Sequence, residues 1–279
     1  MEQLSRLKTR ITNLQELREL MGALRALAAS HVQSAQAALE GIRQYAGVIE
    51  NAIAEGVTLL PGGGVPAVTP TPGADTLVLI GSEHGFVGGF NERLMEHALQ
   101  LLTPARSLAV VGQRALDQAR EQGHEPVWAV AMATQTGGVL EVARGVASRL
   151  TGSDRAELVF AGYRRGGNYE VETRRVLPLD PALLQRAQVR PSPLHHLPAE
   201  LLLQRLADEY LLAELTRAIM ESFASENGAR LRVMEAADQN IDGRLQKLDI
   251  QAHSVRQASI TAELLDVIIG AEAIVGRDG

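Results

Sequence analysis

The chain of 279 residues contains no cysteine, and only 3% of its residues are aromatic. The absence of cysteine excludes disulfides, thiolate zinc sites and cysteine nucleophiles, and it is weakly typical of a cytosolic protein. No apolar run is long enough to cross a bilayer, and residues 1–12 lack the apolar core of a secretion signal. Apolar residues make up 46% of the chain and charged residues 22%, which favours a folded protein over a disordered one.

Proline is absent from residues 1–60 and 199–279, although the chain holds eleven prolines. Because proline in a helix interior costs about 3 kcal/mol, each of these stretches can form one long helix. The net charge is −6, and its negative excess sits at the C-terminal end, so the sequence predicts no general attraction to nucleic acid. The expected organisation is an N-terminal helix over 1–57, a linker over 58–75, a central α/β domain over 76–178, a linker over 179–198 and a C-terminal helix over 199–279.

Both proline-free ends show the periodicity of paired helices. Apolar residues recur every three or four positions from Leu4 to Leu27, which forms one stripe on a helix. In the C-terminal stretch the apolar positions repeat every seven residues from Leu231 to Val255, with Asp238 as the one polar break. A seven-residue repeat predicts left-handed supercoiling, so we expect the two helices to form an antiparallel coiled coil. A self-dimer through one helix is the alternative.

The expected C-terminal helix is too long for a compact domain to enclose. About 80 helical residues extend roughly 120 Å, whereas a compact domain of this chain length has a diameter of about 50 Å. We therefore expect the helix to protrude as a shaft that is paired for part of its length.

The last part of this helix, residues 260–275, is apolar around much of its circumference. A helix of this kind needs to be buried, and the N-terminal helix can cover only one side of it. Because large exposed apolar patches are rare, we expect another protein to cover the remainder; an exposed, frayed tail is the alternative. The apolar residues that we expect to form this tip include Ile260, Leu264, Leu265, Ile268 and Ile269.

Strand and helix signals alternate between the two long helices, which predicts an α/β sheet with short connections. The expected strands are 76–82, 107–111, 128–132, 156–163 and 169–177, the last as an edge strand or hairpin arm. The expected helices are 91–102, 113–122 and 138–150.

No group of residues in the sequence predicts an active site, so we expect no catalytic residue, cofactor or metal. The segment 81–91, GSEHGFVGGFN, could cradle a phosphate, but it lacks the lysine of a P-loop and the glycine spacing of a dinucleotide site. A structural turn is therefore favoured. The adjacent His195 and His196 lack the spacing of metal ligands, and a loop is favoured there. The arginine pairs at 164–165 and 174–175 could bind anions, with solvated strand ends as the default interpretation.

Three blocks of this sequence resemble the gamma subunit of F-type ATP synthase, the central rotor shaft of that complex. The most specific block begins at Ser225 and Glu226 and continues through RQASITAELLDVIIGAEAIV at 256–275; the others are 81–91 and Leu27–Ser30. The resemblance covers nearly the whole chain. Departures such as Ala26 and His31, where the family usually has methionine and lysine, suggest a divergent branch, with an alternative-type bacterial synthase as one interpretation.

The resemblance implies an α/β fold in which a long antiparallel left-handed coiled coil of the N- and C-terminal helices carries a central Rossmann-like α/β domain. It implies a non-catalytic rotor subunit that couples ion flow through a membrane ring to ATP synthesis or hydrolysis at the beta subunits. The implied partners are three alpha and three beta subunits, the epsilon subunit and the membrane c-ring, on the cytoplasmic side of the bacterial plasma membrane.

Matched residue by residue, the resemblance implies polar catch contacts with the beta subunit. These contacts are expected at Arg230, Arg256, Gln257, Thr261 and Glu263. Two alternatives remain open. One is an α/β nucleotide-binding enzyme with a helical arm, which ligand binding by residues 74–178 alone would favour, and the other is a coiled-coil scaffold protein.

Overall fold

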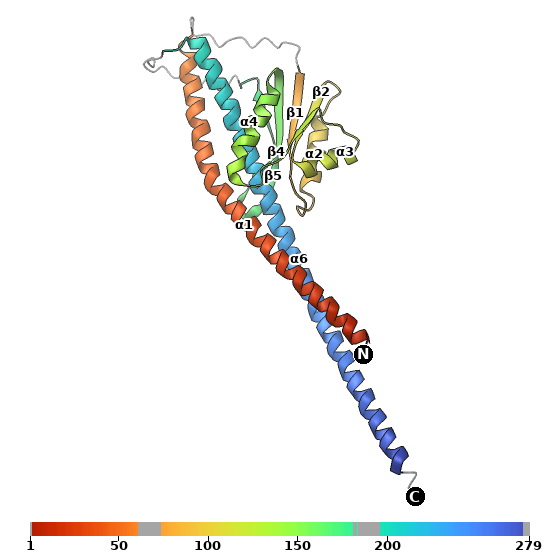
Figure 1. Cartoon of the computed structure of the whole chain (residues 1–279). Helices are drawn as coiled ribbons and strands as arrows, with labels where there is room; N and C mark the ends of the chain where they lie inside the picture. The colour runs from red at the N-terminus through yellow and green to blue at the C-terminus, as the bar shows by residue number, and fades with distance from the viewer. Residues whose placement is uncertain (1, 61–73, 181–182, 184–195, 276–279) are drawn as a thin grey trace. The chain divides into compact units, whose positions relative to one another are not determined.

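The computed structural model describes residues 2–60, 74–180, 183 and 196–275. Most of the two predicted linkers, and His195, lie outside the described residues. The chain forms two compact units, one built from residues 1–26 and 234–279 and the other from residues 27–233. Helix α1, Glu2–Val57, and helix α6, Ala199–Val275, contribute to both units (Figure 1). The prediction of a long helix at each end of the chain is confirmed.

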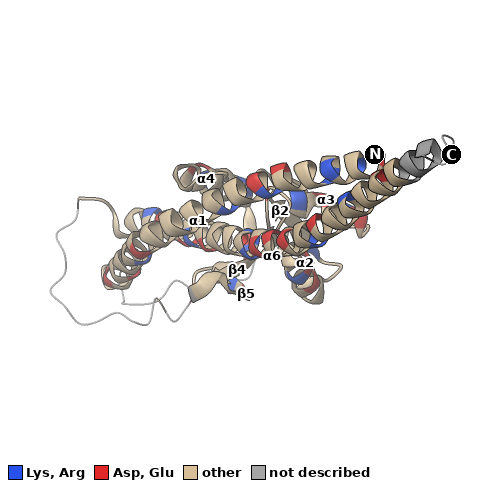
Figure 2. Ribbon diagram, turned by 90° about the horizontal axis from the view of Figure 1, so that it is seen from below, with Lys and Arg blue, Asp and Glu red and all other residues tan. Residues whose placement is uncertain are grey.

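Within each unit α1 and α6 run antiparallel, as predicted. In the first unit Arg18 of α1 bonds to Asp242 of α6, and Arg25 bonds to Asp238. In the second unit His31 bonds to Asn227, and Arg43 bonds to Glu221. The residue number therefore falls along α6 as it rises along α1. Figure 2 shows basic and acidic residues interleaved along both helices. The apolar stripes face inward in the first unit, where the buried residues include Leu7, Met21, Met234, Ile241, Leu245 and Leu248.

The second unit contains a five-stranded sheet in the order β3-β2-β1-β4-β5. Strands β1 to β4 are parallel to their neighbours, whereas β5 runs antiparallel to β4 at the edge. The strands are β1 (Ala74–Ile80), β2 (Arg106–Val111), β3 (Trp128–Val130), β4 (Ser153–Tyr163) and β5 (Tyr169–Leu177). The helices between them are α2 (Phe90–Leu101), α3 (Gln113–Glu121) and α4 (Val139–Leu150). Every expected strand and helix is present, and β5 is the predicted edge strand.

One strand is shorter than its prediction. Strand β3 ends at Val130 rather than at Met132. The backbone N–H of Met132 donates instead to the carboxylate of Glu83 at 2.7 Å. A side chain thus takes the hydrogen bond that would have extended the ladder.

The alternation of side chains along each strand divides the core into two layers. Leu77 and Leu79 of β1 pack with α2 and α3, whereas Val78 and Ile80 pack with α4 and with the parts of α1 and α6 in this unit. Figure 1 shows α2 and α3 on one face of the sheet and α4 on the other. Helix α2, which follows β1, and helix α4, which precedes β4, therefore lie on opposite faces of the sheet. In doubly wound folds the carboxyl ends of two such strands form the crevice that binds ligands.

Candidate functional site

Helix α6 packs across the carboxyl ends of β1 and β4, where a doubly wound fold would bind its ligand. Ser222 Oγ donates to the carbonyl of Ile80 at 2.8 Å, and Ser225 Oγ donates to the carbonyl of Ala161 at 2.9 Å. Both serines are fully buried. The usual position of a nucleotide is therefore occupied by a helix of this chain, which counts against the interpretation as a nucleotide-binding enzyme.

The glycine-rich segment 81–91 is held closed by its own side chains. Asn91 Nδ2 donates to Ser82 Oγ at 2.7 Å, and the backbone N–H of Ser82 donates to Asn91 Oδ1 at 2.9 Å. Glu83 accepts from the backbone N–H of Gln113, the first residue of α3, at 3.0 Å. A helix amino end is where a phosphate would bind, and here a carboxylate takes that place. These contacts support the structural turn rather than the phosphate cradle.

Arg230 of α6 binds the backbone of the segment 81–91. Its guanidinium donates to Glu226 Oε1 at 2.6 Å and to the carbonyl of Gly85 at 3.3 Å, and only 13% of the side chain is exposed. Burial raises the pKa of the Glu226 carboxyl, and the ion pair with Arg230 opposes that rise. Arg230 thus has an intramolecular role within the second unit.

Two buried carboxylates of α6 bind arginines from three elements of the second unit. Glu214 accepts from Arg174 of β5 at 2.5 Å, while Glu221 accepts from Arg43 of α1 at 3.3 Å and from Arg217 of α6 at 3.1 Å. Each glutamate side chain is only 2% exposed. Because a buried charge needs a partner, these pairs tie α1 and β5 to one face of α6.

These buried ion pairs were not predicted from the sequence, in which a solvated strand end was the default interpretation for Arg174. That interpretation is wrong, because the guanidinium of Arg174 is bound to a buried carboxylate. The available signal was the spacing of Glu214 and Glu221, two acidic residues seven positions apart, which share one face of a helix.

The predicted tip of α6 is exposed in the single chain. The exposed fractions are 49% for Ile260, 58% for Leu264, 53% for Leu265 and 54% for Ile268. The side chain of Ile269 lies outside the described residues. Helix α1 begins at Glu2, and its first turns line a hollow with α6 residues up to Val255. The described tip side chains therefore follow the paired part of α6, and the described turns of α1 leave them exposed.

Comparison with known proteins supports an assignment for the whole chain. A family model described as ATP synthase matches residues 3–274. The ATP synthase gamma chains of Paramagnetospirillum magneticum and Geobacter metallireducens are 28% and 26% identical to it, over 98% and 99% of this chain and 100% of each of theirs. This chain belongs to the ATP synthase gamma-chain family. The membership predicted from the C-terminal block is confirmed.

Solved structures agree with the gamma-chain fold. The rotor of Euglena gracilis mitochondrial ATP synthase matches with a TM-score of 0.68 at 14% identity, over 93% of this chain and 99% of that one. The central stalk of the Tetrahymena thermophila enzyme matches with a TM-score of 0.58 at 20% identity, over 78% and 99%. The α/β fold with long terminal helices, predicted from sequence, is therefore that of the family. In the described part of this gamma chain, no helix combines the length and hydropathy of a membrane span.

The contact residues that the resemblance implied divide into two groups in this gamma chain. Arg256, Gln257, Thr261 and Glu263 lie together on exposed turns of α6. The hydrogen bonds of this group are local: Thr261 Oγ1 donates to the carbonyl of Gln257 at 2.9 Å, and Glu263 accepts from the neighbouring Ser259. Arg230 instead lies largely buried in the second unit, where it binds the turn 81–91.

Proposed function

We propose that this chain is the central-stalk rotor subunit of an F-type ATP synthase and that it has no catalytic activity alone. The observation that carries the proposal is the exposed apolar stretch 260–268, in a chain that aligns with ATP synthase gamma chains over 98% of its length. An exposed patch of this kind marks a surface that another protein covers. The proposed cover is a ring of three alpha and three beta subunits, which would hold the nucleotide sites.

In the proposed assembly the paired terminal helices turn inside this ring. A beta subunit that exchanges between two conformations changes its affinity for nucleotide only if the shaft binds one conformation more tightly than the other. The faces of the shaft must therefore differ, so that rotation presents a different surface to each beta subunit. The apolar side chains of the tip would turn against the ring without breaking ion pairs of their own. Polar contacts from the exposed Arg256, Gln257, Thr261 and Glu263 would transmit the torque to the beta subunit. Arg230 is not among these proposed contacts, because its guanidinium is bound to Glu226 and to the carbonyl of Gly85 within the chain.

The central domain would connect the shaft to the rest of the rotor. The proposed partners there are the epsilon subunit and the membrane c-ring, which would place the chain peripherally on the cytoplasmic side of the bacterial plasma membrane. The buried pairs at Glu214 and Glu221 support this role, because they bind β5 and α1 to α6 and so resist slippage between the sheet and the helix.

Co-expression of the tagged chain with the alpha and beta subunits tests the proposal. The chain should co-purify with both, and a bead attached to its central domain should rotate during ATP hydrolysis. Leu264→Asp and Ile268→Asp should lower the yield of the complex, because each puts a charge into the apolar surface that the alpha–beta ring would bury. Val127→Asp is the matched control, since Val127 is 61% exposed on the central domain. A scaffold protein or an independent enzyme would co-purify with neither subunit.

A further inference from the structure

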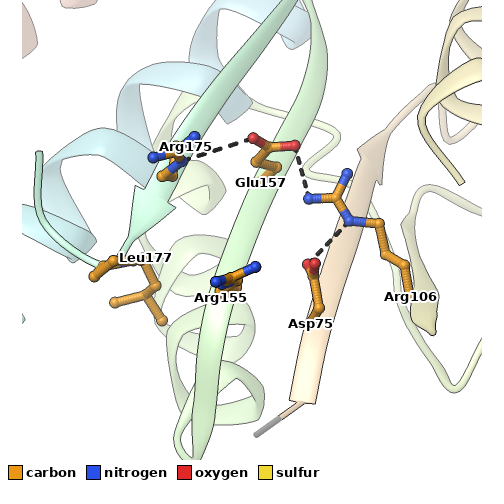
Figure 3. A pocket seen from close by; sticks show the side chains of 7 residues that line it. Asp75, Arg106, Arg155, Glu157, Arg175 and Leu177 are labelled. Atoms are coloured by element: carbon orange, nitrogen blue, oxygen red, sulfur yellow. Dashed lines mark hydrogen bonds and ion pairs between the residues drawn. The ribbon is translucent and has the colours of Figure 1, made fainter. Parts of the chain in front are cut away.

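A charged hollow, which we call the arginine hollow, opens at the amino ends of β1, β2 and β4 (Figure 3). The carboxyl end of β5 completes it, because β5 runs antiparallel to β4. Its volume is about 270 Å³. The residues that line it are Asp75, Arg106, Arg155, Glu157, Arg175, Leu177 and Pro178.

The register of the sheet brings the charged residues together. Asp75 is the cross-strand neighbour of Arg106 on β2 and of Arg155 on β4, while Glu157 is the neighbour of Arg175 on β5. Alternate residues of a strand share one face, so all five lie on the face that α2 covers farther along the sheet. The arginine hollow is thus built by strand pairing rather than by a mobile loop.

The charges of the arginine hollow do not balance. Arg106 is satisfied, with 2.9 Å to Asp75 Oδ1 and 2.7 Å to Glu157 Oε2. Arg175 is 64% exposed and lies 3.8 Å from the other oxygen of Glu157. Arg155 is exposed and makes no hydrogen bond or ion pair with any described residue. Three guanidinium groups therefore face two carboxylates, and one positive charge is left over.

We propose that the arginine hollow binds a carboxylate side chain of a partner protein, held between Arg155 and Arg175. One excess positive charge matches a monoanion, and guanidinium groups pair with carboxylate oxygens in a fixed geometry. Leu177 and Pro178 provide an apolar wall for the methylene groups of an acidic side chain. The adjoining segments 61–73 and 181–195 contain neither Asp nor Glu, so neither can supply the carboxylate.

The position of the arginine hollow indicates which partner it serves. Within the second unit, Glu214 of α6 meets β5, and Ser225, farther along α6, meets the carboxyl end of β4. The amino end of β4, with the arginine hollow, therefore lies toward Ala199, the start of α6. This inference rests on the proposed function, which puts the other end of α6 in the alpha–beta ring. The partner is then a subunit at the membrane side of the rotor.

The test uses the assembled alpha–beta–gamma complex and the detergent-purified c-ring carrying the epsilon subunit, so that no peripheral stalk contributes to binding. Binding is measured by biolayer interferometry at several salt concentrations. The double variant R155E/R175E should bind about tenfold more weakly or worse, with a shallower salt dependence. The control R149E changes an exposed arginine of α4 that donates to the carbonyl of Gly145 in its own helix, and it should bind like the wild type.

The outcomes separate this inference from the proposed function. Both variants should still assemble with alpha and beta and hydrolyse ATP. If the wild-type chain does not assemble, the proposed function fails and the inference fails with it. If the complexes assemble but R155E/R175E binds the ring as the wild type does, only the inference fails.

Discussion

Arg18 of α1 donates a hydrogen bond from Nε to Oδ1 of Asp238 of α6, at 3.2 Å. Asp238 is the polar break in the seven-residue repeat, and its second oxygen accepts from Arg25, also at 3.2 Å. The two arginines are seven residues apart, so they lie on one face of α1 and can bind the same carboxylate in only one antiparallel register. A single polar position that specifies register is a recognised feature of coiled coils.

Asp238→Ala should lower the free energy of unfolding of the first unit by about 1 kcal/mol, the upper range for partly exposed ion pairs. The measurement is the loss of helical circular dichroism with temperature. Glu2→Ala is the control, because the pair of Glu2 with Arg6 is at least 77% exposed on both sides and should contribute nothing measurable. Equal melting of the two variants would contradict the assigned role of Asp238.

Glu214→Ala should destabilise the second unit by about 3 kcal/mol, because it leaves Arg174 with an uncompensated charge in a largely buried site. Urea unfolding followed by circular dichroism measures the change. Glu170→Ala removes the exposed partner of Arg164 and should cost less than about 1 kcal/mol. Similar losses for the two variants would show that burial of the Glu214 pair does not matter.

The contribution of Glu226 to the free energy of unfolding should fall as the pH rises. Burial raises the pKa of this carboxyl above its value in the unfolded chain, so the folded state holds the proton more tightly. The contribution to stability is full below the unfolded-state pKa of about 4.3, and it is lost as the pH rises through the folded-state pKa. Glu226→Gln should remove this loss. The difference in unfolding free energy between variant and wild type should therefore grow from pH 4 to pH 7, and a constant difference would refute the prediction.

Gln257→Ala and Thr261→Ala should leave the free energy of unfolding unchanged and reduce coupled ATP turnover in the assembled complex. Both side chains are exposed, and the bond of Thr261 stays within its own helix turn, so neither supports the fold. Turnover of the complex and thermal melting of the free chain are the two measurements. Unchanged coupled activity would reject a torque contact at these residues.

The purified chain should hydrolyse no ATP and should aggregate through the exposed tip of α6. Leu264→Asp should reduce that aggregation, because it interrupts an apolar surface of which Leu264 is 58% exposed. Light scattering and a phosphate-release assay measure the two properties. ATP hydrolysis by the pure wild-type chain would overturn the non-catalytic role.

The order of the elements could be predicted because each depends on local pattern. Freedom from proline allowed α1 and α6 to be expected along nearly their full length, and apolar runs located the strands. The exposed tip also followed from sequence, since Leu264 and Ile268 belong to a helix that is apolar on too many sides for one partner to cover. The periodicity of apolar residues indicates which face of a helix or strand must be buried. This pattern can be recognised within a short stretch of sequence, without knowledge of the rest of the fold.

Tertiary structure alone decided which charged residues meet. Glu221 and Arg43 lie on different helices, and Arg106 finds Glu157 only through the register of β2, β1 and β4. The same holds for Arg230, whose sequence context resembles a partner contact but whose guanidinium binds the turn at Gly85. The position of a charged residue in the sequence does not indicate which residue it will pair with. Its partner depends on strand register and helix packing, which arise from the burial of the apolar core as a whole.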